Sequence, residues 1–513
     1  MSGPFSQLRR LEDAPALRAR LDELGVDLPV ADAVRADGPL AAPLDHPGAR
    51  LANRFAVLPM EGWDGTVDGR PTDLVRRRWS RFGASGAGLV WGGEAVAVDP
   101  AGRANPHQLT IGDHSEQDLG ELRGVLCDAH RLATAGAQPP VIGLQLTHSG
   151  RWSRPEGRPA PRIAARRPLL DGRVDAHDAH LLTDAELDGL VERFVDAAVV
   201  ARAAGFDFVD VKHCHGYLLH EVLGAVDRPG PYGGSLDGRT TFLRRVVEGI
   251  RRDAPGLDVG VRLSVFDVVP HHAGPDGVGV PSAEGPYPYA FGGDGTGLGI
   301  DLTETHRFCR TMVDLGVRLL CVTAGSPYYC PHVQRPAYFP PSDGYQPPND
   351  PLVDVARLQA ATRELTMAHP ELLVVGSGLT YLQDHLPLVA QELVAQGWMH
   401  TVGLGRMVLS LPELPMQVLG GEELDRRRVC RTFSDCTTAP RHGMVSGCWP
   451  LDEHYRARPE RVELSRAKRQ VALQLGVRGG RARRGGAEGS VTTEEDSTAV
   501  DPAAPAGPAV DVP

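Results

Sequence analysis

Side chains that could bind an anion or exchange a proton follow the short apolar runs of this 513-residue chain. Glycines end two of these runs, and Arg406 follows the second. Because glycine lets backbone N–H groups approach a ligand closely and arginine supplies a fork of donors, we expect a phosphate site there. In chain order, the residues with possible chemistry are Pro59, Met60, Glu61, Gln145, His148, Arg151, Lys212, His215, Tyr217, Arg262, Gly376, Ser377, Gly378, Gly405 and Arg406.

The middle of this set offers a different chemistry. Gln145 and Arg262 carry planar amide and guanidinium groups, which suit the edge of a flat heterocycle. Lys212, His215 and Tyr217 lie within one short stretch and are candidates for acid, base and electrophile. Structural roles are the alternatives, since Lys212 could extend to solvent, Tyr217 could be a core aromatic and the glycines could simply end strands.

The apolar runs recur in a pattern that defines the fold. Each is rich in Val, Leu, Ile and Phe, and most precede a longer segment with apolar residues at helical spacing. The runs are nearly all apolar, as expected when helices cover both faces of a sheet. They lie at residues 54–60, 88–98, 140–148, 206–214, 258–267, 318–326, 372–379 and 400–409. The helical segments include residues 115–136, 183–205, 236–256, 303–316, 350–365 and 380–397.

A series of strand-then-helix units predicts an α/β fold, the (β/α)8 TIM barrel, whose active site lies at the carboxyl ends of the strands. An open doubly wound sheet is the main alternative. The unbroken series favours a closed barrel, and no strand is followed by a GxGxxG turn that opens a helix. The Gly-rich stretch at 291–299 has no strand before it, so we interpret it as a surface loop.

We expect four parts along the chain. Residues 1–45 form a charged N-terminal extension, and residues 46–424 form the barrel. Residues 425–478 contain three of the eight cysteines and a helix near their end. Residues 479–513 contain few large apolar side chains, and we expect this tail to be disordered.

Composition and charge exclude several classes of protein. With 42% hydrophobic and 23% charged residues, the chain has the composition of a globular protein. A net charge of -11 argues against a nucleic acid or an anionic membrane as the main partner. The N-terminus lacks an apolar signal core and no apolar run is long enough to span a membrane, so we expect a cytoplasmic protein with reduced thiols.

Several strings stand at or near the ends of the expected strands. They are NRFAVLPM (53–60), DGRPTDLVRRRWSRFGASGAGLV (68–90), LQLTHSGR (144–151), HGYLLHE (215–221), DRPGPYGGSLDGRTTF (227–242), VRLS (261–264) and VGLGRMVL (402–409). In this order they resemble the Old Yellow Enzyme family of FMN-dependent NADH:flavin oxidoreductases and NADH oxidases, which are FMN-binding TIM barrels. The resemblance covers roughly residues 45–420.

The resemblance implies a cofactor and a division of roles. Tyr217 matches the family's proton donor, which protonates one carbon while the flavin delivers hydride to the other. Arg262 would lie near the flavin N1 and O2, where its charge stabilises the anionic reduced ring. The implied cofactor is FMN, with NADH or NADPH as hydride donor and with Pro59, Met60, Ala95, Gln145, Arg262, Gly378, Gly405 and Arg406 as its binding residues.

The chain departs from the family at the substrate pocket. Where the family has His and then His or Asn as a pair of donors, this chain has Lys212 and His215. Glu61 stands where the family usually has Thr or Cys, and we hypothesise an ion pair between Glu61 and Lys212. Tyr328 could line the same substrate pocket or belong to an exposed loop.

The cysteines after the expected barrel are candidate metal ligands. Some relatives bind a [4Fe–4S] cluster there through four cysteines, but this chain offers only Cys430, Cys436 and Cys448, without the preceding CxxC. His442 could complete a cluster or a zinc site. We expect free thiols, and no metal or iron–sulfur cluster.

These expectations combine into an enzyme that takes hydride from NADH or NADPH and reduces an unsaturated carbonyl-type small molecule through FMN. An FMN-dependent amine dehydrogenase or demethylase is one alternative, since Glu61 and Lys212 would suit an amine. A non-redox TIM-barrel lyase or hydrolase is the alternative from another class. The physiological substrate and the oligomeric state stay open, although a homo-oligomer is possible in principle.

Overall fold

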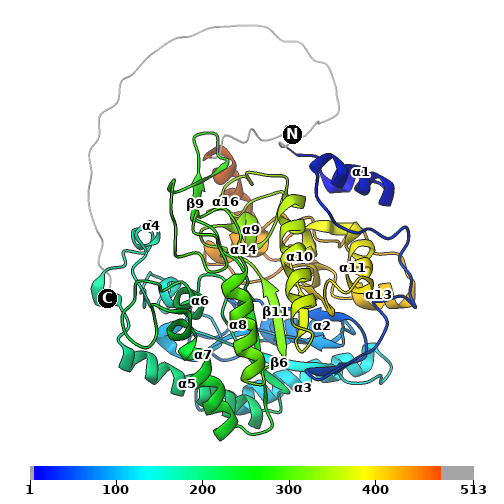
Figure 1. The fold of residues 1–513 in the computed structure, drawn as a ribbon. Helices are drawn as coiled ribbons and strands as arrows, with labels where there is room; N and C mark the ends of the chain where they lie inside the picture. The colour runs from blue at the N-terminus through cyan, green and yellow to red at the C-terminus, as the bar shows by residue number, and fades with distance from the viewer. Residues whose placement is uncertain (1–4, 475–513) are drawn as a thin grey trace, which may run out of the picture.

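Parallel strands close into a barrel at the centre of the structure (Figure 1). The computed structural model describes residues 5–474. The barrel strands are β3 (Phe55–Val57), β4 (Leu89–Val90), β5 (Ala95–Ala97), β6 (Val141–Thr147), β7 (Phe208–Val211), β8 (Asp258–Ser264), β11 (Leu319–Thr323), β12 (Leu373–Gly376) and β13 (Thr401–Leu404). They pair in the order β4, β3, β13, β12, β11, β8, β7, β6, β5, and β4 pairs with β6 to close the ring. Since β4 and β5 both pair with β6, they share one of eight positions.

Helices cover the outside of the barrel. The longer ones are α2 (Asp73–Gly83), α3 (Ser115–Ala133), α5 (Asp184–Ala203), α7 (Leu236–Asp253), α8 (Thr303–Asp314), α10 (Pro351–Ala368), α11 (Leu386–Ala395) and α13 (Leu414–Gly420). α5 begins at a capping box in which the side chains of Thr183 and Glu186 bond each other's backbone N–H groups. This fixes where the helix starts after its connecting loop.

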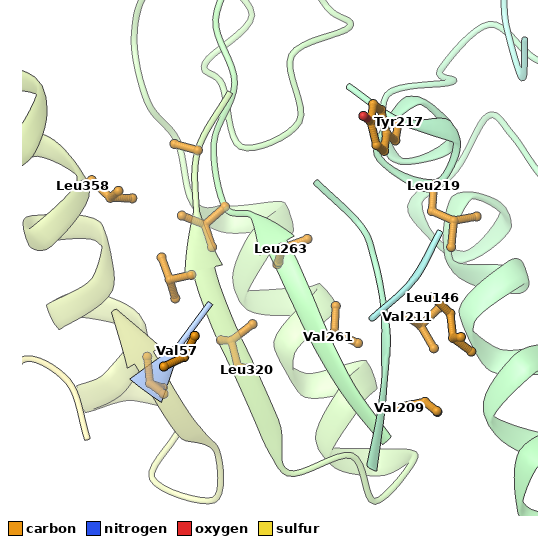
Figure 2. Close-up of a cluster of buried hydrophobic side chains, with 14 of the residues drawn as sticks. Val57, Leu146, Val209, Val211, Tyr217, Leu219, Val261, Leu263, Leu320 and Leu358 are labelled. Carbon is orange, nitrogen blue, oxygen red and sulfur yellow. The ribbon is translucent and has the colours of Figure 1, made fainter. Parts of the chain in front are cut away.

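Alternate residues of each strand point outward to the helices or inward to the barrel, as pleated geometry requires. Val209 and Val211 of β7, and Val261 and Leu263 of β8, belong to the outer layer of apolar contacts (Figure 2). The inward positions form a second apolar cluster in the lower barrel, with Phe208, Leu319, Cys321, Leu373 and Val375. The inward positions nearer the carboxyl ends are polar: Gln145, Asp210, Lys212, Arg262 and Thr323.

A hairpin closes the amino-terminal end of the barrel. β1 (Leu44–His46) and β2 (Ala49–Leu51) pair antiparallel, and Leu44 and Leu51 join the inner apolar cluster. Before it, α1 (Ala14–Leu24) is held to the barrel by Arg20, which forms an ion pair with Asp350 at 2.7 Å. The bottom of the barrel is therefore sealed, and chemistry is confined to the other end.

The connections at the carboxyl ends are long and carry short elements. α9, β9, α14 and α16 gather over one end of the barrel (Figure 1). The short elements of the chain are α4 (Pro168–Asp171), α6 (Leu218–Leu223), β9 (His271–Ala273), β10 (Gly279–Pro281), α9 (Pro331–Gln334), α12 (Met407–Ser410), α14 (Asp435–Arg441) and α15 (Glu453–Arg456), besides five 3₁₀ turns at Leu8–Arg10, Pro100–Gly102, Gly150–Trp152, Asp178–His180 and Leu379–His385. α16 (Arg461–Gln474) is the last helix described.

The segment after the barrel is tied back onto its top. Asp452 accepts two hydrogen bonds of 2.9 Å from Arg77 of α2. The Ser446 hydroxyl accepts the Trp63 N–H at 2.8 Å. These contacts place residues 430–447 over the strand ends, where they can close a site.

The predicted (β/α)8 barrel is confirmed, with all eight strand positions inside the expected runs. The run at 88–98 is two short strands rather than one, because the chain bends between them. α2 was not predicted, since its buried face includes Arg78 and the arginines around it hide the apolar spacing. The expected tail at 479–513 lies outside the described residues, and no described helix is long and apolar enough to cross a membrane.

Candidate active site

A cavity of about 590 Å³ opens at the carboxyl ends of the barrel strands. Its walls come from the strand ends, from the connections that follow several strands, among them those after β5, β6 and β11, and from the segment after the barrel. Of the residues singled out in the sequence, those that line it are Pro59, Met60, Glu61, His215, Arg262, Tyr328, Ser377, Gly378, Gly405, Arg406 and Cys436. Ala95, Gln145, Lys212 and Tyr217 are buried and are not part of the lining.

A buried carboxylate organises the floor beneath the cavity. Asp210 accepts hydrogen bonds from Gln145 Nε2 at 2.6 Å, Trp91 Nε1 at 2.8 Å and the backbone N–H of Arg262 at 2.6 Å. Burial raises the pKa of Asp210, and the three donors oppose that rise. Ala95 is the register partner of Gln145 in the neighbouring strand. Asp210 was missed in the sequence, although an acidic residue within the apolar run at 206–214 is a usable signal.

Arg262 reaches from this floor toward the first strand. Its Nη1 donates to the backbone oxygen of Pro59 at 3.3 Å, while its Nε is buried without a hydrogen-bond partner in the described part of the chain. Because a buried N–H without a partner is costly, this atom is suited to a ligand in the cavity.

Tyr217 and Glu61 meet at the cavity wall. The Tyr217 hydroxyl donates to Glu61 Oε2 and lies 3.0 Å from the Tyr328 hydroxyl. Burial first, and then the Glu61 charge, raises the pKa of Tyr217 well above its ordinary value. Tyr217 therefore stays protonated at any ordinary pH. Tyr328 lies in the pocket as expected, so the alternative of an exposed loop residue is wrong.

The hypothesised ion pair between Glu61 and Lys212 is wrong. The Lys212 ammonium lies over the Tyr217 ring, 3.9 Å from its centroid, and forms no ion pair with a carboxylate among the described residues. Glu61 instead accepts the tyrosine hydroxyl, so both charged groups contact Tyr217, Lys212 at the ring face and Glu61 at the hydroxyl. Burial lowers the pKa of Lys212, and it does not extend to solvent.

His215 is held in a constrained turn. Its φ of +67° lies in the left-handed region, which non-glycine residues rarely adopt. The hydroxyls of Ser264 and Ser326 bond its backbone N–H and carbonyl at 3.1 and 2.8 Å. Its Nε2 lies 3.1 Å from Gln334 Nε2, a contact that the sequence did not predict. Burial lowers the pKa of His215 well below its ordinary value, so the ring is neutral.

Two guanidinium groups meet where the last two barrel strands end. The Nε and Nη2 atoms of Arg335 are buried and have no hydrogen-bond partner among the described residues. Arg406 Nη1 is also buried and also lacks a hydrogen-bond partner there. Burial and then the charge of Arg406 lower the pKa of Arg335 to about 9. A Cβ placed on Gly405 would meet no atom within 4 Å, because it would enter the cavity. The arrangement fits an anion, and Arg335 was missed in the sequence.

The segment after the barrel supplies one wall of the cavity. Thr437 Oγ1 accepts a hydrogen bond from Arg335, and Cys436 and Arg441 line the same wall. Cys430 and Cys448 are buried, and all eight cysteines are free. Within residues 5–474 no group of three or more His, Cys, Asp or Glu side chains is placed to hold a metal ion, so Cys430, Cys436 and Cys448 with His442 do not form a metal site in this structure.

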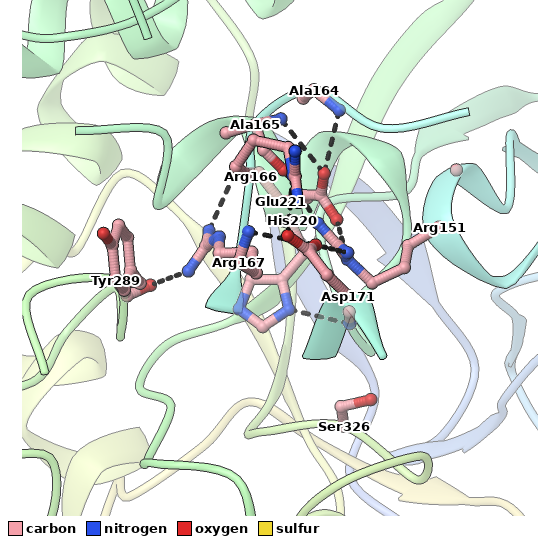
Figure 3. A network of polar contacts seen from close by, with 12 residues as sticks. Arg151, Ala164, Ala165, Arg166, Arg167, Asp171, His220, Glu221, Tyr289 and Ser326 are labelled. Atoms are coloured by element: carbon pink, nitrogen blue, oxygen red, sulfur yellow. Dashed lines mark hydrogen bonds and ion pairs between the residues drawn. The ribbon is translucent and has the colours of Figure 1, made fainter. Parts of the chain in front are cut away.

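Two residues singled out at the end of β6 lie outside the cavity. Arg151 is held in a buried network by Glu221 at 2.8 Å and Asp171 at 2.5 Å (Figure 3). His148 Nδ1 accepts the Gly150 N–H at 3.0 Å. Both residues hold the loop that follows the strand, and neither lines the cavity.

Comparisons with known proteins agree with this arrangement. The model of the NADH:flavin oxidoreductase / NADH oxidase family matches residues 39–280. An NADPH dehydrogenase of Geobacillus thermodenitrificans (strain NG80-2) is 32% identical over 241 residues, which are 45% of this chain and 64% of that enzyme. The 12-oxophytodienoate reductase 7 of Oryza sativa subsp. japonica is 29% identical and is aligned over 47% of this chain and 62% of its own length. The chain thus spans less than two thirds of either relative.

The fold is also found among solved structures. A 2-naphthoyl-CoA reductase in complex with 2-naphthoyl-CoA superposes with a TM-score of 0.60, at 17% identity, over 84% of this chain and 58% of that chain. At this level of identity the likeness concerns the fold. It agrees with the closed barrel.

Proposed function

Because this chain belongs to the NADH:flavin oxidoreductase / NADH oxidase family, the family of Old Yellow Enzyme, we propose that it is an FMN-dependent ene-reductase. In this proposal it takes hydride from NADH or NADPH and reduces the C=C bond of an unsaturated carbonyl compound. The name of the rice relative, a 12-oxophytodienoate reductase, supports that substrate class. The family argues against the non-redox lyase or hydrolase.

The observation that carries the proposal is the pair of arginines with unused donors beside Gly405. FMN carries a phosphate dianion, and Arg335 with Arg406 would hold it with two guanidinium groups. Gly378 and Gly405 would let the backbone approach it. FMN would supply the ring that accepts and delivers hydride. Its ring would be bound through the backbone of Pro59, the Met60 side chain and the free Nε of Arg262. Gln145, which is buried beneath the lining and bonded to Asp210, would support the ring from the floor of the cavity.

Tyr217 is the proposed proton donor. Its raised pKa keeps the hydroxyl protonated, so it is an acid and not a base at neutral pH. When the proton leaves, the ring becomes a phenolate, and the Lys212 ammonium 3.9 Å from the ring centroid stabilises that negative charge. Tyr328 and Glu61 hydrogen-bond the hydroxyl and form a route by which the proton is replaced.

His215 is the proposed carbonyl-binding residue. It is neutral, lines the cavity, and is oriented by Gln334 and by the two serines that fix its turn. A neutral imidazole can donate one N–H to a carbonyl oxygen, as the family's paired donors do. The second donor position is taken by Lys212, which lies behind the Tyr217 ring. In this chain His215 is therefore the one donor of the pair that can reach the carbonyl, and other residues that line the cavity must complete the orientation of the substrate.

An amine dehydrogenase remains the second candidate, because Glu61 places a carboxylate beside the proton donor. We further propose that the enzyme acts in the cytoplasm, where all eight free cysteines would stay reduced.

A visible spectrum of the purified protein tests the cofactor and the first half-reaction together. We expect a flavin spectrum that bleaches under anaerobic NADH or NADPH, and release of FMN by acid. Reoxidation by an enal or enone with formation of the saturated product would establish the second half-reaction. A colourless protein that added FMN does not saturate would refute the proposal. A flavin that is reduced by an amine, and not by NADH or NADPH, would favour the second candidate.

A further inference from the structure

Two arginines line the cavity beside Tyr328, and the flavin site proposed above does not use them. The guanidinium carbon of Arg441 lies 5.4 Å from the centroid of the Tyr328 ring. Arg154 lines the same wall, and the charges of both arginines act on the Tyr328 hydroxyl. That hydroxyl is 3.0 Å from the hydroxyl of Tyr217. The two cations therefore stand close to the proposed proton donor.

A flat apolar surface adjoins these cations. The rings of Trp152 and Tyr328 are stacked, with centroids 4.4 Å apart and planes inclined by 6°. Both residues line the cavity, and Arg154 follows Trp152 by two positions. A planar, conjugated group fits beside such a stack, and any negative substituent on it would meet the arginines.

The two arginines of this wall differ in how their donors are used. Arg154 has no side-chain hydrogen bond or ion pair there. Arg441 pairs with Asp343, whose side chain is 45% exposed. Glu61, which accepts the Tyr217 hydroxyl, is the second carboxylate near this wall. Burial lowers the pKa of Arg441, and the charge of Arg154 acts in the same direction, while Tyr328, Tyr217 and Glu61 oppose it. Among the described residues, Arg154 is therefore the arginine of the two whose side-chain donors are unused.

We propose that Arg154 and Arg441 bind a carboxylate carried by the substrate, whose planar conjugated part packs against Trp152 and Tyr328. This inference rests on the proposed function, because it assigns the substrate class of the same site. Arginine suits the task because its planar fork donates two parallel hydrogen bonds to a carboxylate. The preferred substrate is then an aromatic or conjugated acid, and a cationic amine is disfavoured by the same two charges.

Binding of three matched ligands to the holoenzyme tests this directly. Benzoate, benzamide and benzylammonium share one ring and differ in charge. Titrations followed by the flavin absorbance, and by calorimetry as an independent readout, give a dissociation constant for each. We expect benzoate to bind at least about tenfold more tightly than benzamide, since charge-assisted hydrogen bonds are the stronger ones, and benzylammonium to bind most weakly.

Variants then show which residues cause the preference for benzoate over benzamide. Arg154→Gln and Arg441→Gln should each remove most of the difference between benzoate and benzamide, while benzamide binding changes little. Arg158→Gln is the matched control, since it changes the net charge equally on the same loop but its side chain is 79% exposed and paired with Glu156. Because loss of the Asp343 contact could loosen the wall, Arg441→Lys serves as a second variant that keeps the charge.

Each outcome decides the inference. Equal affinity for benzoate and benzamide in the wild-type enzyme would overturn it, as would tighter binding of benzylammonium, which would favour an amine substrate. If Arg154→Gln and Arg441→Gln raised the KM for NADPH but not for NADH and left benzoate unchanged, the anion would be the 2′-phosphate of the hydride donor. Anaerobic bleaching by NADPH in the same preparation reports the proposed function separately.

Discussion

The ammonium of Lys212 lies 3.9 Å from the centroid of the Tyr217 ring, on the ring face, while the hydroxyl of the same tyrosine is bonded to Glu61. A cation on the face of a phenol is attracted by the ring, and more strongly once the ring becomes a phenolate. Burial makes the contact matter, because both side chains are removed from water. The pair thus stabilises the product of proton donation more than its starting state.

Replacing Lys212 by methionine should slow the step in which substrate is protonated. A cation–π contact of this kind contributes about 0.5 to 2 kcal/mol, so we expect about a 2- to 30-fold decrease in the rate of flavin reoxidation by substrate. Stopped-flow measurement of the two half-reactions would separate this from flavin reduction by NADPH, which should be unchanged. Lys468→Met is the control, because it removes the only other lysine of the chain. Lys468 forms an ion pair with Asp435 and does not contact Tyr217. An equal loss in both half-reactions would contradict this role.

Tyr217→Phe should remove the proton donor itself. General acid catalysis by a positioned side chain contributes about 10²- to 10⁴-fold, and the oxidative half-reaction should fall by this factor. Since the pKa of Tyr217 is raised above its ordinary value, the wild-type rate should show no loss from its ionisation up to about pH 10. Tyr329→Phe is a suitable control, since its hydroxyl bonds Asp267 at 2.6 Å instead of meeting Glu61. A pH profile that falls near neutrality in the wild type but not in Tyr217→Phe would contradict the assignment.

Arg335→Gln should weaken the binding of FMN more than the binding of riboflavin. The lost group is a buried guanidinium with two unused donors, and a hydrogen bond to a charged group contributes about 1.5 to 3 kcal/mol. We therefore expect about a 10- to 100-fold increase in the Kd of FMN for the apoprotein, and an unchanged Kd of riboflavin, from fluorescence titration. Arg335→Lys should recover part of the loss. An equal increase in the Kd of both flavins would mean that Arg335 holds the cavity wall in place and does not bind the phosphate.

Much of the site could be predicted because strands impose a direction on their side chains. Gln145, Lys212 and Arg262 stand at inward positions near strand ends, and the apolar runs around them fix the register. Gly405 and Arg406 follow a strand directly, so their place at the cavity follows from the barrel. The partner of Lys212 differs from the prediction, since charge alone points to Glu61, whereas the ammonium lies over the ring of Tyr217.

The remainder of the site comes from connections, where no periodicity constrains a side chain. Gln334 and Arg335 lie between β11 and α10, and Arg441 lies beyond the barrel. Their directions depend on long-range contacts, such as the bond of Arg335 to Thr437. An isolated arginine among prolines at 331–341 is the only local signal for Arg335. Loops carry function but are the least predictable part of a fold from one sequence.

Asp354→Asn should change how stability depends on pH. Burial raises the pKa of Asp354 from 3.8 to about 7, and its Oδ2 has no hydrogen-bond partner among the described residues. A raised folded-state pKa means that its stabilising contribution is present below about pH 4 and is lost as the pH rises through about 7. Asparagine resembles the neutral acid and does not ionise.

At pH 8 the Asp354→Asn variant should therefore melt above the wild type, by about 2 °C or more, and at pH 4 the two should melt together. Differential scanning calorimetry at both pH values measures this, with FMN saturating throughout. Asp253→Asn is the control, because that carboxylate is partly exposed and paired with the adjacent Arg252. Glu94, whose pKa burial also raises to about 7, will keep a pH dependence in both proteins, so the difference between them is the informative quantity. If the melting temperatures of variant and wild type differed by the same amount at both pH values, Asp354 would not change its ionisation in the folded protein between pH 4 and pH 8, and the prediction would be wrong.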